Sequence, residues 1–248
     1  MTQSLQRHLQ DVANARRLEL IPYIYQCTSG RVQTGPFQGM VISPRTSWGD
    51  GDTAAKLLGV YEDELHPWIS DAVASRPDLL INIGCAEGYY AIGICRLLPY
   101  IPALAVDINL AAKNSVAENI LANVINGLDV LIQTTDCAWL EDRCQLPKQP
   151  LIIMDCESAE LELLDPIKVP SLHKCRIIVE CHDCMVPGIT QTLIDRFSAS
   201  HMIEQVKQKT KDPYQFDFLD VLSDCDKWCL VHEGRPNSMT WLYMVPRG

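Results

Sequence analysis

Apolar segments that suit buried strands alternate with segments of helical periodicity from about residue 78 onward, and this alternation limits the fold more than any other feature of the chain. Helical patterns near 89–98, 110–124, 159–164 and 188–197 separate strand patterns at 79–83, 103–107, 128–134, 151–155 and 176–180. Strands that alternate with helices form parallel sheets covered on both faces. The sequence therefore predicts an α/β fold with a doubly wound, mostly parallel sheet.

The two ends of the chain differ from this pattern. Strand patterns near 203–209 and 239–245 are expected to form an antiparallel pair at one edge of the sheet. The connection between them, which contains KDPYQFDF and HEGRPNS, is expected to be a loop that reaches over the site. Residues 1–70 show a helical pattern near 4–20, a Pro- and Gly-rich stretch and a second helical pattern near 54–68. We expect 1–70 to form an N-terminal helical cap on a domain at 71–248.

Charge and composition argue against several classes of function. Lys and Arg number 21 against 31 Asp and Glu, and this net charge of −10 makes nucleic acid a poor default partner. The start of the chain has no signal-peptide pattern, and no apolar run approaches the roughly 20 residues of a membrane helix. We therefore expect a cytoplasmic protein whose 11 cysteines are reduced. Zinc held by the CHDC and CDKWC pairs is a weaker alternative.

The loop in LLINIGCAEGYYAIG follows the first strand pattern and indicates the ligand. A dinucleotide site uses G-x-G-x-x-G, but Asn82 stands in place of the first glycine and Glu87 in place of the third. A carboxylate at the third position would repel a pyrophosphate, and no G-K-[ST] follows for a nucleoside triphosphate. The loop favours a ligand with a cationic amino acid end and no phosphate, which is S-adenosylmethionine.

Acidic residues after the next two strand patterns support this cofactor. Asp107 ends the second strand, where its carboxylate can accept hydrogen bonds from ribose hydroxyls, and Asp136 follows the third, near the expected adenine edge. The structural alternative is that the glycines only permit a tight turn and that Asp107 caps a helix. The predicted cofactor-binding residues are Asn82, Gly84, Ala86, Glu87, Gly88, Asp107, Ile108, Asp136 and Cys137.

The segments INIGCAEGYYAIG, MDCESAELELL and IVECHD together resemble the class I adenosylmethionine-dependent methyltransferases, and more narrowly the FkbM-like family. This resemblance covers most of residues 50–200, and GPFQGM and KLLGVYEDEL are similar to the start of some FkbM-like proteins from metabolite and glycan clusters. It implies a Rossmann-like fold and methyl transfer to a small metabolite or glycan-type acceptor. Asn82 departs from the acidic residue, and Ser158 from the glycine, that are more usual in the family.

A group of ionisable residues follows the fourth and fifth strand patterns, and we expect it to carry the chemistry. Asp155, Glu180, His182 and Asp183 should converge because neighbouring parallel strands end at the same edge. The catalytic candidates are His182, Glu180 and Asp155, with His182 as a general base. Alternatively Asp155, His182 and Asp183 hold Mg²⁺ or Mn²⁺, similar to the ligands of catechol-type methyltransferases. In the third interpretation the cluster is structural.

We therefore expect O-methylation of a small-molecule acceptor, with N-methylation of an amine as the nearest alternative. A non-catalytic adenosylmethionine-binding scaffold is the alternative from another class. We expect no nucleic-acid or membrane partner, and a homodimer remains open. Trp48, Tyr214 and Arg235 lie in expected loops and are weaker candidates for substrate contact.

Overall fold

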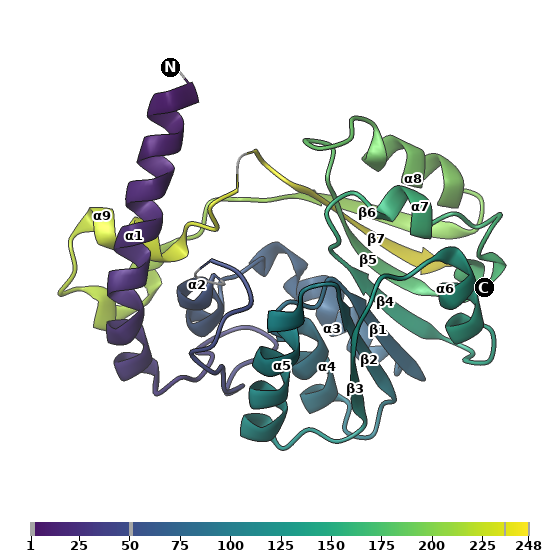
Figure 1. The fold of residues 1–248 in the computed structure, drawn as a ribbon, viewed down its shortest axis with the longest axis horizontal. Helices are drawn as coiled ribbons and strands as arrows, with labels where there is room; N and C mark the ends of the chain where they lie inside the picture. The colour runs from purple at the N-terminus through teal and green to yellow at the C-terminus, as the bar shows by residue number, and fades with distance from the viewer. Residues whose placement is uncertain (1–2, 50–51, 236, 248) are drawn as a thin grey trace.

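A computed structural model describes residues 3–49, 52–235 and 237–247, and one seven-stranded sheet lies on the right in the view of Figure 1. The strand order is β3-β2-β1-β4-β5-β7-β6. The strands are β1 (Leu79–Ile83), β2 (Ala103–Asp107), β3 (Leu128–Ile132), β4 (Pro150–Met154), β5 (Arg176–Cys181), β6 (His201–Lys207) and β7 (Thr240–Pro246). Strands β1 to β5 are parallel, whereas β7 runs antiparallel between β5 and β6. The α/β, Rossmann-like, mostly parallel sheet with an antiparallel edge pair is confirmed.

Helices cover both faces of the sheet because alternate strand residues enter different cores. One core receives Leu80, whereas the other receives Ile81. The first core contains side chains of α3 (His66–Ala74), α4 (Tyr89–Leu97) and α5 (Leu110–Asn123). The second contains side chains of α6 (Cys137–Cys144), α7 (Glu160–Leu163) and α8 (Ile189–Phe197), next to the 3₁₀ turn η2 (Pro170–Lys174).

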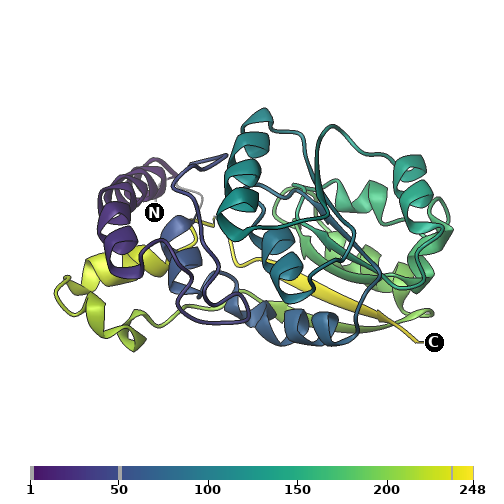
Figure 2. The ribbon, with the colours of Figure 1, turned by 90° about the horizontal axis from the view of Figure 1, so that it is seen from below.

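The remaining helices form a lobe at the other end of the molecule, where α1 (Gln3–Thr28) lies beside α9 (Asp224–Val231) in both views (Figures 1 and 2). Arg16 of α1 forms an ion pair with Asp226 of α9 at 2.7 Å. The lobe also contains α2 (Thr53–Leu58) and the 3₁₀ turns η1 (Asp63–Leu65), η3 (Pro213–Gln215) and η4 (Asp217–Leu219). The segment between β6 and β7 was expected to be a loop. That expectation is wrong for the part that forms η3, η4 and α9, whereas the described residues 232–235 of HEGRPNS form a loop as expected.

The helix expected near 54–68 is interrupted at Gly59. This residue ends α2 with a φ of +79°, and a Cβ there would lie 2.3 Å from the carbonyl oxygen of Thr34. The close approach of the two backbones therefore breaks the helix, and the chain resumes as η1 and α3. The boundary expected at residue 70 falls inside α3. Among the described residues, no helix combines the length and the apolar character needed to cross a membrane.

Candidate active site

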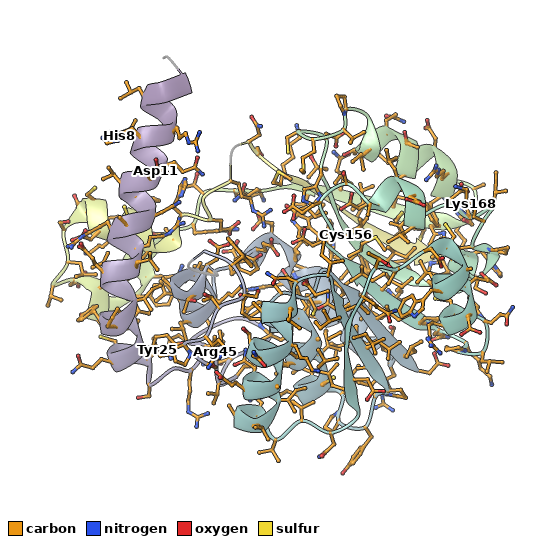
Figure 3. All side chains as sticks on the ribbon, viewed as in Figure 1. His8, Asp11, Tyr25, Arg45, Cys156 and Lys168 are labelled. Carbon is orange, nitrogen blue, oxygen red and sulfur yellow. The ribbon has the colours of Figure 1, made fainter. Side chains whose placement is uncertain are left out.

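A cavity of about 780 Å³ lies at the carboxyl ends of the parallel strands, between the sheet and the N-terminal and late segments. This volume lies within the range of roughly 300–1,000 Å³ of small-molecule sites. Asn82, Asp107 and Asp155 line it from the sheet, whereas Trp48 and Arg235 line it from the other segments. Cys156, which also lines the cavity, is labelled in Figure 3 between the sheet and the helical lobe.

The glycines of the loop after β1 serve the backbone. Gly84 has a φ of +75°, and a Cβ on it would lie 1.6 Å from the carbonyl oxygen of Asp155. Gly88 has a φ of +81° and precedes α4, where a Cβ would meet Val116 at 3.3 Å. Gly84 lines the cavity, but Gly88 is not among the described residues that line it. The turn interpretation therefore accounts for both glycines, and Gly84 in addition borders the cavity.

Asp107 holds this loop and also faces the cavity. Its Oδ2 accepts a hydrogen bond from the backbone N–H of Ala86 at 2.9 Å, and its Oδ1 accepts one from Asn109 at 2.7 Å. A carboxylate offers about four acceptor positions, so Asp107 retains capacity for two ribose hydroxyls. Ala86 and Ile108 line the cavity beside it. The carboxylate therefore fits the role predicted for it.

Asn82 offers a second acceptor to the cavity. Its side chain is 2% exposed, and its Nδ2 donates to the carbonyl oxygen of Ile153 at 3.3 Å. Its Oδ1 is buried and has no hydrogen-bond partner among the described residues. A buried acceptor without a partner costs about 1–3 kcal/mol, and an ammonium group in the cavity would satisfy it. The hydrogen-bond acceptors on this wall therefore fit the amino group and the ribose hydroxyls of adenosylmethionine.

Glu87 binds residues of the N-terminal segment and is not among the described residues that line the cavity. Its Oε1 accepts from the backbone N–H of Ser47 at 2.6 Å, and its Oε2 pairs with Lys56 at 3.1 Å. Burial raises the pKa of Glu87, but the Lys56 charge and the Ser47 hydrogen bonds outweigh this and leave it lowered. Glu87 thus fastens the N-terminal segment to the loop, which corrects its prediction as a cofactor contact.

Asp136 and Cys137 also lie outside the described lining of the cavity. Asp136 caps α6, since its carboxylate accepts from the backbone N–H of Trp139 at 2.8 Å. The Cys137 thiol donates to the carbonyl oxygen of Glu162 at 3.1 Å. The residues that follow β3 in the lining are Gln133, Thr134 and Thr135. The turn after β3 therefore reaches the cavity, but through residues earlier than predicted.

Asp155, Glu180 and His182 come together as predicted. His182 is 4% exposed, and its Nε2 lies 3.4 Å from Asp155 Oδ1 and 3.8 Å from Glu180 Oε2. Its Nδ1 lies 2.9 Å from Oε1 of the fully buried Glu160. Glu157 completes the surroundings, with its Oε2 at 3.6 Å from Nε2. Asp155, Glu157, Glu180 and His182 line one wall of the cavity, whereas Glu160 is not among the described lining residues. We call Asp155, Glu180 and His182 the strand-end cluster.

Asp183 is not part of the strand-end cluster. Its carboxylate accepts from the backbone N–H of Gly188 at 3.0 Å and from the Thr190 hydroxyl, and so it fixes the start of α8. It is not among the described residues that line the cavity. The prediction that Asp183 shares a cation with Asp155 and His182 is therefore wrong, because this side chain is used to hold a turn.

Arg235 connects three segments at the cavity, and its role was missed. It donates to the carboxylates of Glu180 and Glu62, and its Nε donates to Glu233 Oε2 at 3.2 Å. Glu62 comes from the N-terminal segment and is 1% exposed. No pattern along the chain indicates this network, since its members are distant in sequence. Trp48 and Arg235 line the cavity as expected, whereas Tyr214 does not.

The crowding of acidic groups shifts their proton affinities. Burial, with the charge of Asp155, raises the pKa of Glu180 well above its ordinary value. Burial also raises the pKa of Glu62 to about 7, although Arg235 opposes the shift. Burial lowers the pKa of His182, but its hydrogen bond to Glu160 and the charge of Asp155 outweigh this and leave it raised. The buried carboxyl groups of Glu180 and Glu62, and the His182 ring, therefore retain a proton more readily than the free side chains do.

No family model and no curated protein matches this sequence. Similar solved structures include the O-methyltransferase TomG from Streptomyces achromogenes in complex with SAM, at 8% identity and a TM-score of 0.48 over 83% of this chain and 92% of that chain. Cofactor-bound Rv0187 from MTB has 9% identity and a TM-score of 0.47 over 76% of this chain and 82% of that chain. Precorrin-6y C5,15-methyltransferase from Geobacter metallireducens has 12% identity and a TM-score of 0.45 over 72% and 87%. At these values the likenesses carry no argument about function.

Proposed function

We propose that this protein is an S-adenosylmethionine-dependent methyltransferase that acts on a hydroxyl of a small metabolite or glycan-type acceptor. One observation carries the proposal. A single cavity places the acceptors of Asn82 and Asp107 on one wall and the strand-end cluster on another. The first wall suits the amino acid and ribose parts of the cofactor, and the second suits an acceptor that must lose a proton.

The wall formed by Asn82 and Asp107, which we call the cofactor wall, orients the cofactor. The Asp107 carboxylate accepts hydrogen bonds from the ribose hydroxyls, and Asn82 Oδ1 accepts one from the amino group. When bound, adenosylmethionine supplies a methyl group whose carbon–sulfur bond breaks, with the electron pair passing to sulfur, as the acceptor oxygen bonds to carbon. Such a transfer depends on alignment, because holding two reactants in the correct geometry is itself a large part of the rate gain.

The strand-end cluster removes the acceptor's proton. The hydrogen bond from His182 Nδ1 to Glu160 leaves Nε2 to receive that proton. Asp155 and Glu180 then stabilise the imidazolium that forms, since Nε2 faces both. A divalent cation held by the same cluster is the second way to activate a hydroxyl. The finer resemblance to FkbM-like proteins is the basis for including glycan-type acceptors.

Transfer to nitrogen is the second candidate function, and the acidic lining favours it. Asp155, Glu157 and Glu233 all border the cavity, and together they would attract a cationic amine. The amine must be neutral to react, so the same cluster would remove its proton. The two candidates differ in the acceptor that is methylated.

Titration calorimetry with adenosylmethionine, followed by a radioactive methyl assay, tests the proposal. We expect binding of one cofactor per chain and labelling of hydroxyl-bearing acceptors from metabolite and oligosaccharide pools. Asp129→Asn is the matched control for Asp107→Asn, because Asp129 is an exposed carboxylate on the neighbouring strand β3. Absence of cofactor binding would refute the proposal, and binding without any turnover would favour the scaffold alternative. Labelling of amines alone would replace oxygen by nitrogen.

A further inference from the structure

The strand-end cluster has the arrangement of a cation site. A ligand atom of Asp155, one of Glu180 and one of His182 all lie within 4.8 Å of one another. Within the described part of the chain, this is the one group of three or more acidic, Cys or His side chains placed in this way. The CHDC and CDKWC cysteines are therefore not brought together. All three residues of the cluster line the cavity, where a ligand can reach them.

The His182 ring is oriented as a metal ligand would be. Its Nδ1 side is occupied by Glu160 Oε1 at 2.9 Å, so Nε2 can present its lone pair to the cavity. A carboxylate that fixes the far nitrogen of a histidine is a common support of metal-binding imidazoles. Nε2 lies 3.4 Å from Asp155 and 3.8 Å from Glu180, which is longer than a normal hydrogen bond of about 2.7–3.2 Å. Donor atoms around a small divalent cation stand about 3 Å apart, given bonds of about 2.1 Å.

Glu180 provides an independent indication of a ligand. Its side chain is 1% exposed, and Arg235 occupies its Oε1. Its Oε2 is buried, faces His182 and has no hydrogen-bond donor in the described residues. A buried carboxylate oxygen without a donor is unfavourable. A cation between Glu180, Asp155 and His182 would satisfy it.

The donor set selects the type of cation. Two carboxylates and one imidazole favour Mg²⁺ or Mn²⁺ over softer metals. Cys156 also lines the cavity, but it is not among the three residues whose ligand atoms converge. Three protein ligands leave further coordination positions toward the cavity, where an acceptor oxygen can bind.

We propose that Asp155, Glu180 and His182 form a Mn²⁺- or Mg²⁺-binding site, with Glu160 as the positioning residue that orients His182. The site deepens the proposed function and rests on it for its catalytic meaning, since the cation would hold the acceptor hydroxyl and favour loss of its proton. In that case His182 serves as a ligand, and the proton leaves to solvent or to Glu157.

Binding of Mn²⁺ to the chelator-treated full-length protein, measured by calorimetry and electron paramagnetic resonance without cofactor, tests this site. We expect one Mn²⁺ per chain, loss of binding in His182→Ala and an affinity lowered roughly 10- to 100-fold in Glu160→Gln. Asp183→Asn is the matched control, because Asp183 holds α8 and should leave Mn²⁺ binding unchanged. Thermal unfolding of each variant shows whether it is folded.

Failure of the wild-type protein to bind Mn²⁺ at millimolar concentration would overturn the proposal, and so would binding that survives in folded His182→Ala. Either result leaves the cofactor wall untouched, because adenosylmethionine binding is measured separately. Conversely, a protein that binds Mn²⁺ but no adenosylmethionine would keep the site and refute the methyltransferase. The two failures are therefore distinguishable.

Discussion

The turn after β1 and the turns after β4 and β5 are both rich in polar residues, yet they differ in how these residues are satisfied. After β1, Glu87 is paired with Lys56 and Ser47, and Gly84 packs against the backbone of Asp155. After β4 and β5, the polar atoms of the strand-end cluster face one another at 3.4–3.8 Å. Polar groups that already have hydrogen-bond or ion-pair partners stabilise the fold. Polar groups that face one another in a cavity without such partners are available to bind a ligand. Substitutions in the two regions should therefore differ in kind, and the largest effect is expected in the turn after β1.

Gly84→Ala is expected to destabilise the protein by on the order of 4 kcal/mol or more. The new Cβ would lie 1.6 Å from the carbonyl oxygen of Asp155, which follows β4. Gly188→Ala is the control, since Gly188 has a φ of +90° but, apart from its chain neighbours, no atom of the described residues lies within 4 Å of the place its Cβ would take. It should cost about 1–2 kcal/mol. Denaturant unfolding measures both. A folded Gly84→Ala protein of normal stability that loses only cofactor affinity would show that this glycine serves the ligand.

Lys56→Met is expected to cost about 3–5 kcal/mol at neutral pH, because it leaves the buried Glu87 without its counter-ion. The exposed pair Arg45 and Glu118 is the control, and Arg45→Met should change stability little. Since the folded-state pKa of Glu87 is lowered, its contribution is present above the unfolded pKa near 4.5 and is lost as pH falls below it. Glu87→Gln should remove this part of the acid dependence. An unchanged pH profile would contradict the pairing.

His182→Ala is expected to lower turnover by roughly 10²- to 10⁴-fold while adenosylmethionine affinity stays nearly constant. Asp183→Asn should leave turnover close to wild type, since Asp183 only holds the start of α8. Steady-state rates with and without a chelator distinguish a general-base mechanism from a cation-dependent one, because a chelator leaves the activity of a general base unchanged. Equal, full activity of both variants would make the strand-end cluster structural.

Asp107→Asn is expected to weaken adenosylmethionine binding about 10- to 100-fold, since hydrogen bonds to a charged acceptor contribute about 1.5–3 kcal/mol. The amide still accepts one backbone N–H, so the fold should persist. Titration calorimetry compares the adenosylmethionine affinity of Asp107→Asn with that of the control Asp129→Asn. Equal affinities in the two variants would remove Asp107 from the cofactor wall.

The sheet could be predicted from sequence because its strands are short apolar runs buried on both faces, as in β1 and β4. The ends of parallel neighbours meet by topology, so Asp155, Glu180 and His182 could be predicted to converge. Which acidic side chains face the cavity and which bind the backbone could not be predicted. Asp136 and Asp183 each bind a backbone N–H that only the folded turn presents. The Arg235 network was inaccessible for a similar reason, because it joins Glu62 to Glu180 across the fold.

A crystal structure with S-adenosylhomocysteine, the demethylated product, tests the proposed division of the cavity most directly. We expect the ribose hydroxyls on the carboxylate of Asp107, the amino group at Asn82 Oδ1 and the sulfur directed toward Asp155, Glu180 and His182. Product bound outside this cavity, or with its sulfur turned away from the strand-end cluster, would contradict that division.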